Sequence, residues 1–355
     1  MTWYMGIDLH ARTFAIAVKD RDGNELFVET YKTSCEKLRE IVGSVNGKKW
    51  VVFEESTLAS WAYRVLQGCG ATVVVADPYH NRLIGKDGKM DDKRAARKLA
   101  DLLRWGEINR VHHTADLARQ GFREVVLMYL DTTRDRTRVK NRLKSKFQQH
   151  GVVCRRADVY LPESRAKWRQ KLESPDAKLQ VDLLWADLDH LEEKSERLRR
   201  LIQERAKGID VIRRLRAVPG IGLIRASTFY VLVDTPHRFE DKRNLWSYCG
   251  IGLEGRESGE SQEPDHLVRR FNPRLKDVAK GAAASAIAAR NNRYSEQYVQ
   301  YLIDKPQKAA SARLTVARSI LSTMYELWRR GTEYDPQYHR EARAWGKQTD
   351  NDTVG

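Results

Sequence analysis

Four acidic residues near the beginning of the chain have the types and spacing that divalent-metal chemistry requires. Asp8 follows the apolar residues Tyr4–Ile7, Glu54 lies near the end of the run WVVFEE, and Asp91 and Asp92 open a helical pattern. Carboxylate oxygens are ligands that Mg²⁺ prefers, and the ion keeps waters that a phosphate can replace. Two such ions about 4 Å apart can activate a nucleophile and stabilise a leaving oxygen. Acids at strand ends are also common without a metal, so spacing alone makes this site a hypothesis.

An α/β domain over residues 1–113 is expected to position these acids. The first three strands should form a β-meander, at 2–9, 13–19 and 25–32. Two further strands, at 50–55 and 71–76, alternate with helical patterns at 35–46, 58–67 and 91–105. This alternation indicates βαβ units and a mixed sheet.

Composition narrows the class of protein. The 355 residues contain 64 Lys and Arg against 48 Asp and Glu, a formal net charge of +16, and 41% of the residues are hydrophobic. No apolar run approaches the roughly 18 residues of a membrane span, so we expect no membrane partner. The four cysteines form no CxxC pair, which argues against a zinc ribbon or a disulfide scaffold. We therefore expect a reducing, cytoplasmic compartment, and the excess of positive charge suits a polyanion, with nucleic acid as the leading candidate.

Most of the positive charge is concentrated in one stretch. Residues 119–171 contain fifteen Lys and Arg against five Asp and Glu. The apolar residues Val139, Leu143 and Phe147 recur every four positions here, which indicates a helix. We expect its exposed cations to follow a nucleic-acid backbone, although a solvated helix surface is the alternative. The cations at every second position are Arg134, Arg136, Arg138, Lys140, Arg142, Lys144 and Lys146.

A helical, coiled-coil region is expected over 114–208, followed by a mostly helical domain over 209–335 and a disordered tail over 336–355. The seam Leu184, Leu188, Leu191, Ser195, Leu198, Ile202 steps by four and three residues, as in a heptad repeat. Such a seam can close within the chain or join two chains, and the sequence leaves both open.

Two later segments carry candidate functional residues. Gly220 and Gly222 flank Ile221 between two helical patterns, where exposed backbone amides could bind a phosphate. An ordinary helix–helix turn explains these glycines equally well. Residues 253–272 are rich in Gly, Glu and Ser and indicate a long polar loop, which is usually functional or mobile.

The order of these features resembles a known family. A strand ending in Asp, a β-meander, a strand ending in Glu and an acid-bearing helix resemble the RuvC/RNase H-like nucleases. Over most of residues 4–330 the chain is similar to the RuvC-like insertion-sequence transposases of the Piv/MooV group, the IS110 family. The resemblance is carried by GIDLH (6–10), VVFEES (51–56), VVVADP (73–78), KMDDKRAARKLADLLRWGEINRV (89–111), RTRVKNRLKSKF (136–147), VPGIGLIRAS (218–227), FEDKRNLWSYCGI (239–251) and RESG (256–259).

The resemblance implies a fold of class α/β plus α and a Mg²⁺ site of four acids. The first acid of the family matches Asp8 and the second matches Glu54, with Glu55 as the alternative that points to the other sheet face. The third matches Asp92. The fourth acid of the family falls on Ala95, which is the sharpest departure from the pattern. Asp101 is about half a turn out of phase with Asp92 and cannot easily replace the missing acid.

The resemblance also implies a serine nucleophile in the C-terminal domain. Ser258 lies before Gly259 and shortly after Tyr248-Cys249-Gly250, as the family pattern requires, and Ser261 is the near miss. The implied activity is RNA-guided recombination of donor and target DNA through a covalent phosphoserine. The implied partners are a guide (bridge) RNA and further copies of the chain, in a tetramer whose active site is composite.

Two alternatives stay open at this point. A catalytically inactive or domesticated relative that only binds nucleic acid is favoured by Ala95. A RuvC-like nuclease without serine chemistry is disfavoured by the RESG match.

Overall fold

The computed structural model describes residues 1–79, 91–114, 116–155, 157–254, 257–258, 261–262 and 266–337. The chain divides into two compact units, Met1–Ala115 and Asp116–Gly355. The predicted boundary near residue 208 falls inside the second unit, and the predicted disordered tail lies almost wholly outside the described residues. Within the described ranges, no helix combines the length and the apolar character needed to cross a bilayer.

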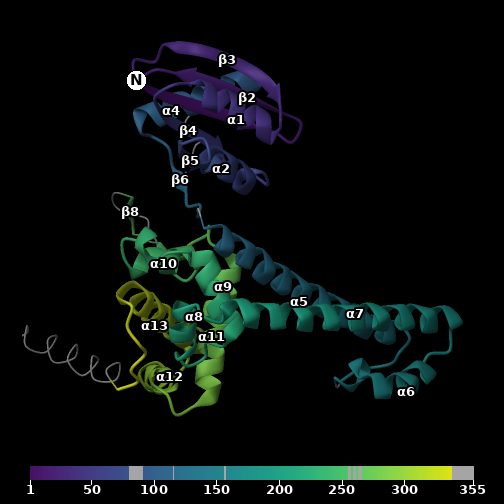
Figure 1. The fold of residues 1–355 in the computed structure, drawn as a ribbon. Helices are drawn as coiled ribbons and strands as arrows, with labels where there is room; N and C mark the ends of the chain where they lie inside the picture. Colours follow the sequence, from purple (N-terminus) through teal and green to yellow (C-terminus); the bar gives the residue numbers. More distant parts are fainter. Residues whose placement is uncertain are drawn as a thin grey trace, which may run out of the picture. The chain divides into compact units, whose positions relative to one another are not determined.

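The first unit is built on a six-stranded mixed sheet with the order β3-β2-β1-β4-β5-β6 (Figure 1). The first three strands form the predicted antiparallel meander, while β4 and β5 run parallel to β1. The two-residue β6 pairs antiparallel with β5 and was not predicted. The strands are β1 (Thr2–Leu9), β2 (Thr13–Lys19), β3 (Glu25–Lys32), β4 (Lys48–Glu54), β5 (Thr72–Ala76) and β6 (Arg110–Val111).

Helices cover both faces of this sheet, because residues alternate between the faces along each strand. Met5, Ile7 and Phe53 point to one face and belong to one core with α1 (Cys35–Ser44) and α2 (Ala59–Gln67). Val52 and Val74 point to the other face and pack against leucines of α4 (Asp92–Trp105). The chain therefore forms the RuvC-like α/β arrangement that the sequence predicts.

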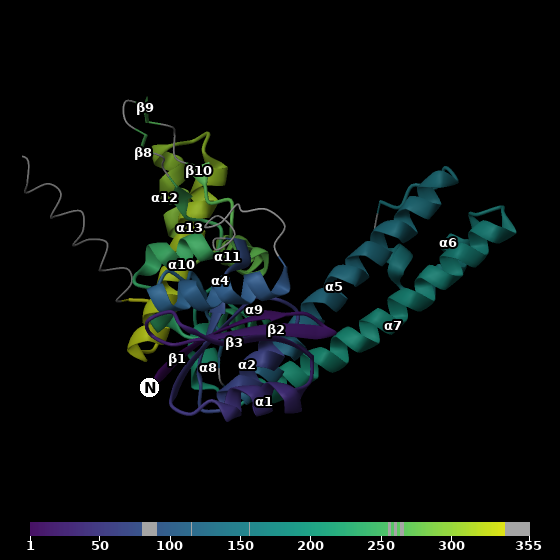
Figure 2. The same cartoon turned by 90° about the horizontal axis from the view of Figure 1, so that it is seen from above.

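A long helical hairpin dominates the second unit. The helices α5 (Leu117–Gln149) and α7 (Pro175–Ala206) lie side by side over much of their length, as both views show (Figures 1 and 2). Within the predicted seam, Leu188, Ser195, Leu198 and Ile202 of α7 are buried. These four residues pack within the chain, where α7 contacts α5, while Leu184 and Leu191 of the same seam are half-buried.

Separate hydrophobic cores hold the two ends of this hairpin. At the far end, Phe147 of α5, Trp185 of α7 and Trp168 of α6 (Arg165–Gln170) belong to one buried cluster. At the near end, Phe122 and Ile202 join the large core of the C-terminal helices. Those helices are α8 (Asp210–Arg216), α9 (Leu223–Val233), α10 (Lys242–Tyr248), α11 (Pro273–Ala289), α12 (Arg293–Asp304) and α13 (Ala309–Arg330).

The segment predicted as a long polar loop contains short strands. β7 (Leu253–Glu254) pairs antiparallel with β10 (His266–Leu267), and β8 (Glu257–Ser258) pairs antiparallel with β9 (Ser261–Gln262). The prediction was wrong for these residues, because two-residue ladders are too short to produce a visible alternation of polar and apolar residues.

Candidate metal site and nucleophile segment

The first two predicted acids lie at the carboxyl ends of the neighbouring strands β1 and β4. The parallel register pairs Ile7 with Phe53, so Asp8 and Glu54 are the next residues on neighbouring strands. Residues in register on parallel strands point to the same face, and neighbouring strands are about 4.8 Å apart. Asp8 and Glu54 therefore share the face that α4 covers.

The third predicted acid, Asp92, lies at the beginning of α4, and this helix packs unusually closely on β1. Gly6 has no side chain, and a Cβ there would lie 2.1 Å from the carbonyl oxygen of Ala96. Only glycine allows this approach, which places the first turn of α4 beside the end of β1. The carboxylate of Asp91 accepts a hydrogen bond from the Arg94 amide at 2.8 Å and caps the helix. Asp91 is thereby committed to capping, and Asp92 is the first residue of the helix.

Asp8, Asp92 and His10 form a cluster with potential metal ligands. Their ligand atoms all lie within 4.8 Å of one another. The Nε2 atom of His10 is 3.4 Å from Asp8 Oδ2 and 3.9 Å from Asp92 Oδ1. His10 was missed as a site residue, although it belongs to the quoted motif GIDLH, because it lies in a turn where no periodicity marks its direction.

The electrostatics of the cluster favour a bound cation. Burial raises the pKa of Asp8 above its ordinary value, His10 acts in the opposite direction, and the nearby carboxylate of Asp92 raises it further. A divalent cation would relieve the repulsion between the two carboxylates. The two clustered carboxylates fit the hard-oxygen preference of Mg²⁺ and Mn²⁺. Glu54 is next to Asp8 in the strand register, but its carboxylate is not among the ligand atoms of this cluster.

The structure separates the other acids from this cluster. Glu55 contacts His113, whose ring lies 5.5 Å from that of Tyr63 on α2, so Glu55 lies on the opposite face from α4. The carboxylate of Asp101 accepts a hydrogen bond from Lys19 Nζ at 2.6 Å. Ala95 is half-buried one turn after Asp92.

Comparisons with known proteins find transposases. A family profile described as "Transposase" matches residues 5–151, and another described as "Transposase IS116/IS110/IS902 family" matches residues 212–300. The chain belongs to the IS110 family of transposases. The y4qE protein of Sinorhizobium fredii, a transposase by name, is 24% identical over 78% of this chain and 69% of its own length. The transposase for insertion sequence element IS1111A of Coxiella burnetii is 21% identical over 77% of this chain and 75% of its own length.

In this transposase, the predicted nucleophile lies in the second unit. Ser258 is in β8, and its backbone pairs with that of Ser261 in β9. The side chains of both serines lie outside the described residues. The base of the segment is held firmly, because Arg318 of α13 donates a hydrogen bond to the Ile251 carbonyl oxygen at 2.7 Å and the Asn272 amide donates one to Tyr248 at 2.9 Å.

The predicted basic run lies on α5 as expected, but several of its cations already contact protein groups. Val139, Leu143 and Phe147 are buried, which confirms the helical interpretation. Lys140 Nζ is 3.1 Å from Glu192 of α7. The full set of predicted cations on α5 comprises Arg134, Arg136, Arg138, Lys140, Arg142, Lys144 and Lys146.

Gly220 has a structural reason to be glycine. It has a positive φ of 86°, and a Cβ there would lie 2.3 Å from the Ala282 carbonyl oxygen of α11. Gly222 precedes α9 with no neighbour within 4 Å of an added Cβ. Phosphate binding by these two glycines stays a prediction.

Proposed function

We propose that this transposase cuts and rejoins DNA of an insertion sequence as an RNA-guided serine recombinase. The observation that carries the proposal is the convergence of Asp8 and Asp92 at one edge of the sheet, with their ligand atoms within 4.8 Å. Two carboxylates at this separation repel each other, and a divalent cation held between them would offset that repulsion.

Asp8, Glu54 and Asp92 are the proposed ligands for Mg²⁺. When bound, the ion would supply Lewis-acid stabilisation of charge at the scissile phosphate. His10 would orient the Asp8 carboxylate through its Nε2 atom. Ser258 is the proposed nucleophile, and its Oγ would replace one strand oxygen on phosphorus, leaving a phosphoserine and a free strand end.

The proposed partners are donor DNA, target DNA, a guide (bridge) RNA and further copies of the chain in a tetramer. The resemblance to the Piv/MooV group supports the RNA and the composite site, and the basic stretch 119–171 supports a nucleic-acid partner. The DNA sequence would then be selected by base pairing with the guide RNA, so the protein would need mainly contacts with the sugar–phosphate backbone and with the shape of the nucleic acid. Cytoplasmic, nucleoid-associated localisation is proposed on the same grounds.

An inactive or domesticated nucleic-acid-binding relative is the second candidate. The observation that favours it is Ala95, which stands three residues after Asp92 where the family pattern has its fourth acid. Residues three apart share a helix face, so an acid there would complete the cluster and its absence leaves three ligands.

The test is a search for a covalent protein–DNA adduct. The full chain is incubated with the guide RNA, donor DNA, target DNA and Mg²⁺, and denaturing gels report any adduct. The proposal expects an adduct that is lost in Ser258→Ala and in Asp8→Asn, but kept in Ser261→Ala. DNA binding without an adduct, with an adduct appearing in Ala95→Asp, would establish the second candidate instead.

A further inference from the structure

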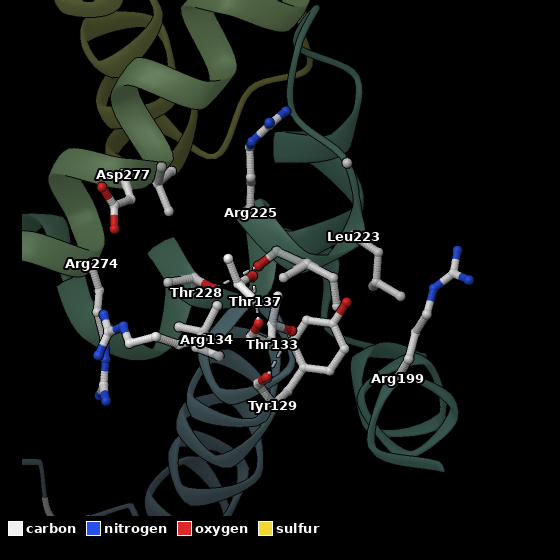
Figure 3. A pocket seen from close by; sticks show the side chains of 14 residues that line it. Tyr129, Thr133, Arg134, Thr137, Arg199, Leu223, Arg225, Thr228, Arg274 and Asp277 are labelled. Atoms are coloured by element: carbon white, nitrogen blue, oxygen red, sulfur yellow. Dashed lines mark hydrogen bonds between the residues drawn. The ribbon is translucent and has the colours of Figure 1, made fainter. Parts of the chain in front are cut away.

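A cavity of about 590 Å³ lies within the second unit, between α5, α7, α9 and α11 (Figure 3). Its size is within the range of small-molecule sites, and well above what one phosphate group needs. Aromatic, aliphatic, hydroxyl and cationic side chains line it, together with the carboxylate of Asp277 on α11. The residues that the following argument uses are Tyr129, Thr133, Arg134, Leu223, Arg225 and Arg274.

Cations are fixed around this cavity by contacts with the protein. Arg274 donates two hydrogen bonds to the carboxylate of Asp131, at 2.8 and 3.0 Å, and Arg134 Nη1 lies 3.6 Å from the same carboxylate. Figure 3 shows the guanidinium groups of Arg134 and Arg274 side by side at one end of the cavity. One carboxylate thus holds two guanidinium groups, so a positive charge remains there.

Arg225 adds a further cation on another side. Its Nη1 donates hydrogen bonds to the Gly220 carbonyl oxygen at 2.8 Å and to Ser285 Oγ at 2.9 Å. Both of these hydrogen-bond acceptors are neutral. Burial of the guanidinium lowers the pKa of Arg225. An anion would therefore be stabilised beside it.

Neutral side chains form another part of the lining. In Figure 3 the ring of Tyr129 lies between Thr133 and Leu223. The Thr133 hydroxyl donates to the Tyr129 carbonyl oxygen at 3.0 Å, so only its lone pairs face a ligand. A planar ligand that stacks on the ring, offers amino or imino hydrogens and carries anionic groups at its ends would match this arrangement.

We propose that the cavity receives one unpaired base of a nucleic-acid strand, stacked on Tyr129, with the flanking phosphates at Arg225 and at the Arg134–Arg274 pair. This inference rests on the proposed function, since it assumes that the transposase binds nucleic acid. Aromatic stacking of splayed bases is the usual way in which proteins bind single strands. The cavity would thus hold a strand where pairing is interrupted.

The experiment uses the full chain and fluorescently labelled strands of one sequence, as single-stranded DNA, single-stranded RNA and duplex DNA. Tyr129→Leu should weaken single-strand binding by about fivefold to a hundredfold, since stacking contributes about 1–3 kcal/mol per base. Tyr129→Phe keeps the ring and should bind like the parent. Arg225→Gln should reduce the salt dependence of single-strand binding by about one phosphate contact, whereas the exposed Arg197→Gln on α7 is the matched control that should not.

The measurement with duplex DNA distinguishes a failure of the cavity proposal from a failure of the proposed function. Unchanged duplex affinity with weakened single-strand affinity in Tyr129→Leu supports the cavity, and the stronger of the DNA and RNA arms names the strand. Equal single-strand affinity in the parent and Tyr129→Leu would overturn the cavity while leaving the proposed function intact. If the parent bound neither duplex nor single strand, the proposed function itself would fail. Circular dichroism on each variant shows that a loss of binding is not a loss of folding.

Discussion

Glu54 and Glu55 are neighbours in the chain, yet they leave β4 towards opposite faces of the sheet. Glu54 is in register beside Asp8 on the face that α4 covers, while Glu55 contacts His113 on the other face. This difference of one residue gives a matched pair of variants for the metal site.

Glu54→Gln should weaken the binding of Mn²⁺, used as a probe for the divalent site, by about tenfold or more, because even outer-shell partners of a metal typically contribute that much. Isothermal titration calorimetry on the full chain measures the affinity. Glu55→Gln removes the same charge from the other face and should bind the ion like the parent. Equal losses in both variants would show that net charge, not the cluster, attracts the ion.

Ala95→Asp should tighten Mn²⁺ binding by about tenfold, since it adds a carboxylate on the Asp92 face of α4. Ala95→Asn has nearly the same shape without the charge and serves as the control. An aspartate with no effect would mean that the first turn of α4 points its side chains away from the ion.

Acidification should weaken metal binding at a higher pH than an ordinary aspartate would cause, because the pKa of Asp8 is raised by burial and by Asp92. Asp92→Asn removes the repulsive carboxylate and should lower the pKa of Asp8, whereas His10→Gln should raise it. Carboxyl-carbon NMR titration of the metal-free protein follows Asp8 directly. Shifts in the reverse directions would contradict the arrangement.

The same raised pKa predicts the sign of a stability effect. The metal-free folded protein binds a proton at Asp8 more readily than the unfolded chain does, so this group lowers stability as pH rises through its folded pKa. Asp8→Asn should therefore increase the resistance of the metal-free protein to urea at neutral pH. The gain should vanish below the unfolded pKa, where both states are protonated.

Gly6→Ala should destabilise the first unit by about 1–3 kcal/mol, the usual cost of overpacking, because the added methyl group meets the backbone of Ala96. It should also weaken Mn²⁺ binding, since α4 must move away from Asp8. Gly43→Ala is the control: in α1, with nothing within 4 Å of the added group, it should stabilise by about 0.5–1 kcal/mol. Urea unfolding measures both.

Trp168→Ala should loosen the far end of the helical hairpin by about 3–5 kcal/mol without unfolding the C-terminal core, since the two ends have separate clusters. Hydrogen exchange should rise around α6 and stay unchanged in α9 and α13. Faster exchange throughout the second unit would show that the hairpin and the core unfold together.

The sequence predicted those helices and strands whose apolar residues form a long run or a regular repeat. The largely apolar runs of β1 and β2 and the four-residue repeat of Val139, Leu143 and Phe147 each extend over enough residues to be visible. β6, with only two residues, gives no such signal. Its pairing depends on β5 being present, which is a tertiary effect.

The candidate site was predictable where strand ends specify it. Asp8 and Glu54 follow apolar strands, so their meeting follows from sheet geometry. The place of His10 beside both aspartates depends on a turn conformation, which local sequence does not encode. The cavity at Tyr129 is lined by residues of four helices, and no sequence pattern within any one of these helices indicates it.

The helical hairpin has a consequence for how this lineage of enzymes can vary. Its two ends are anchored by independent clusters, and its middle contains the buried polar residues Thr132 and Ser195 instead of a large core. Paired insertions or deletions of two turns in both arms would change its reach by about 10 Å while preserving both anchors. The length of the hairpin can therefore differ between related chains while the packing at each end stays the same.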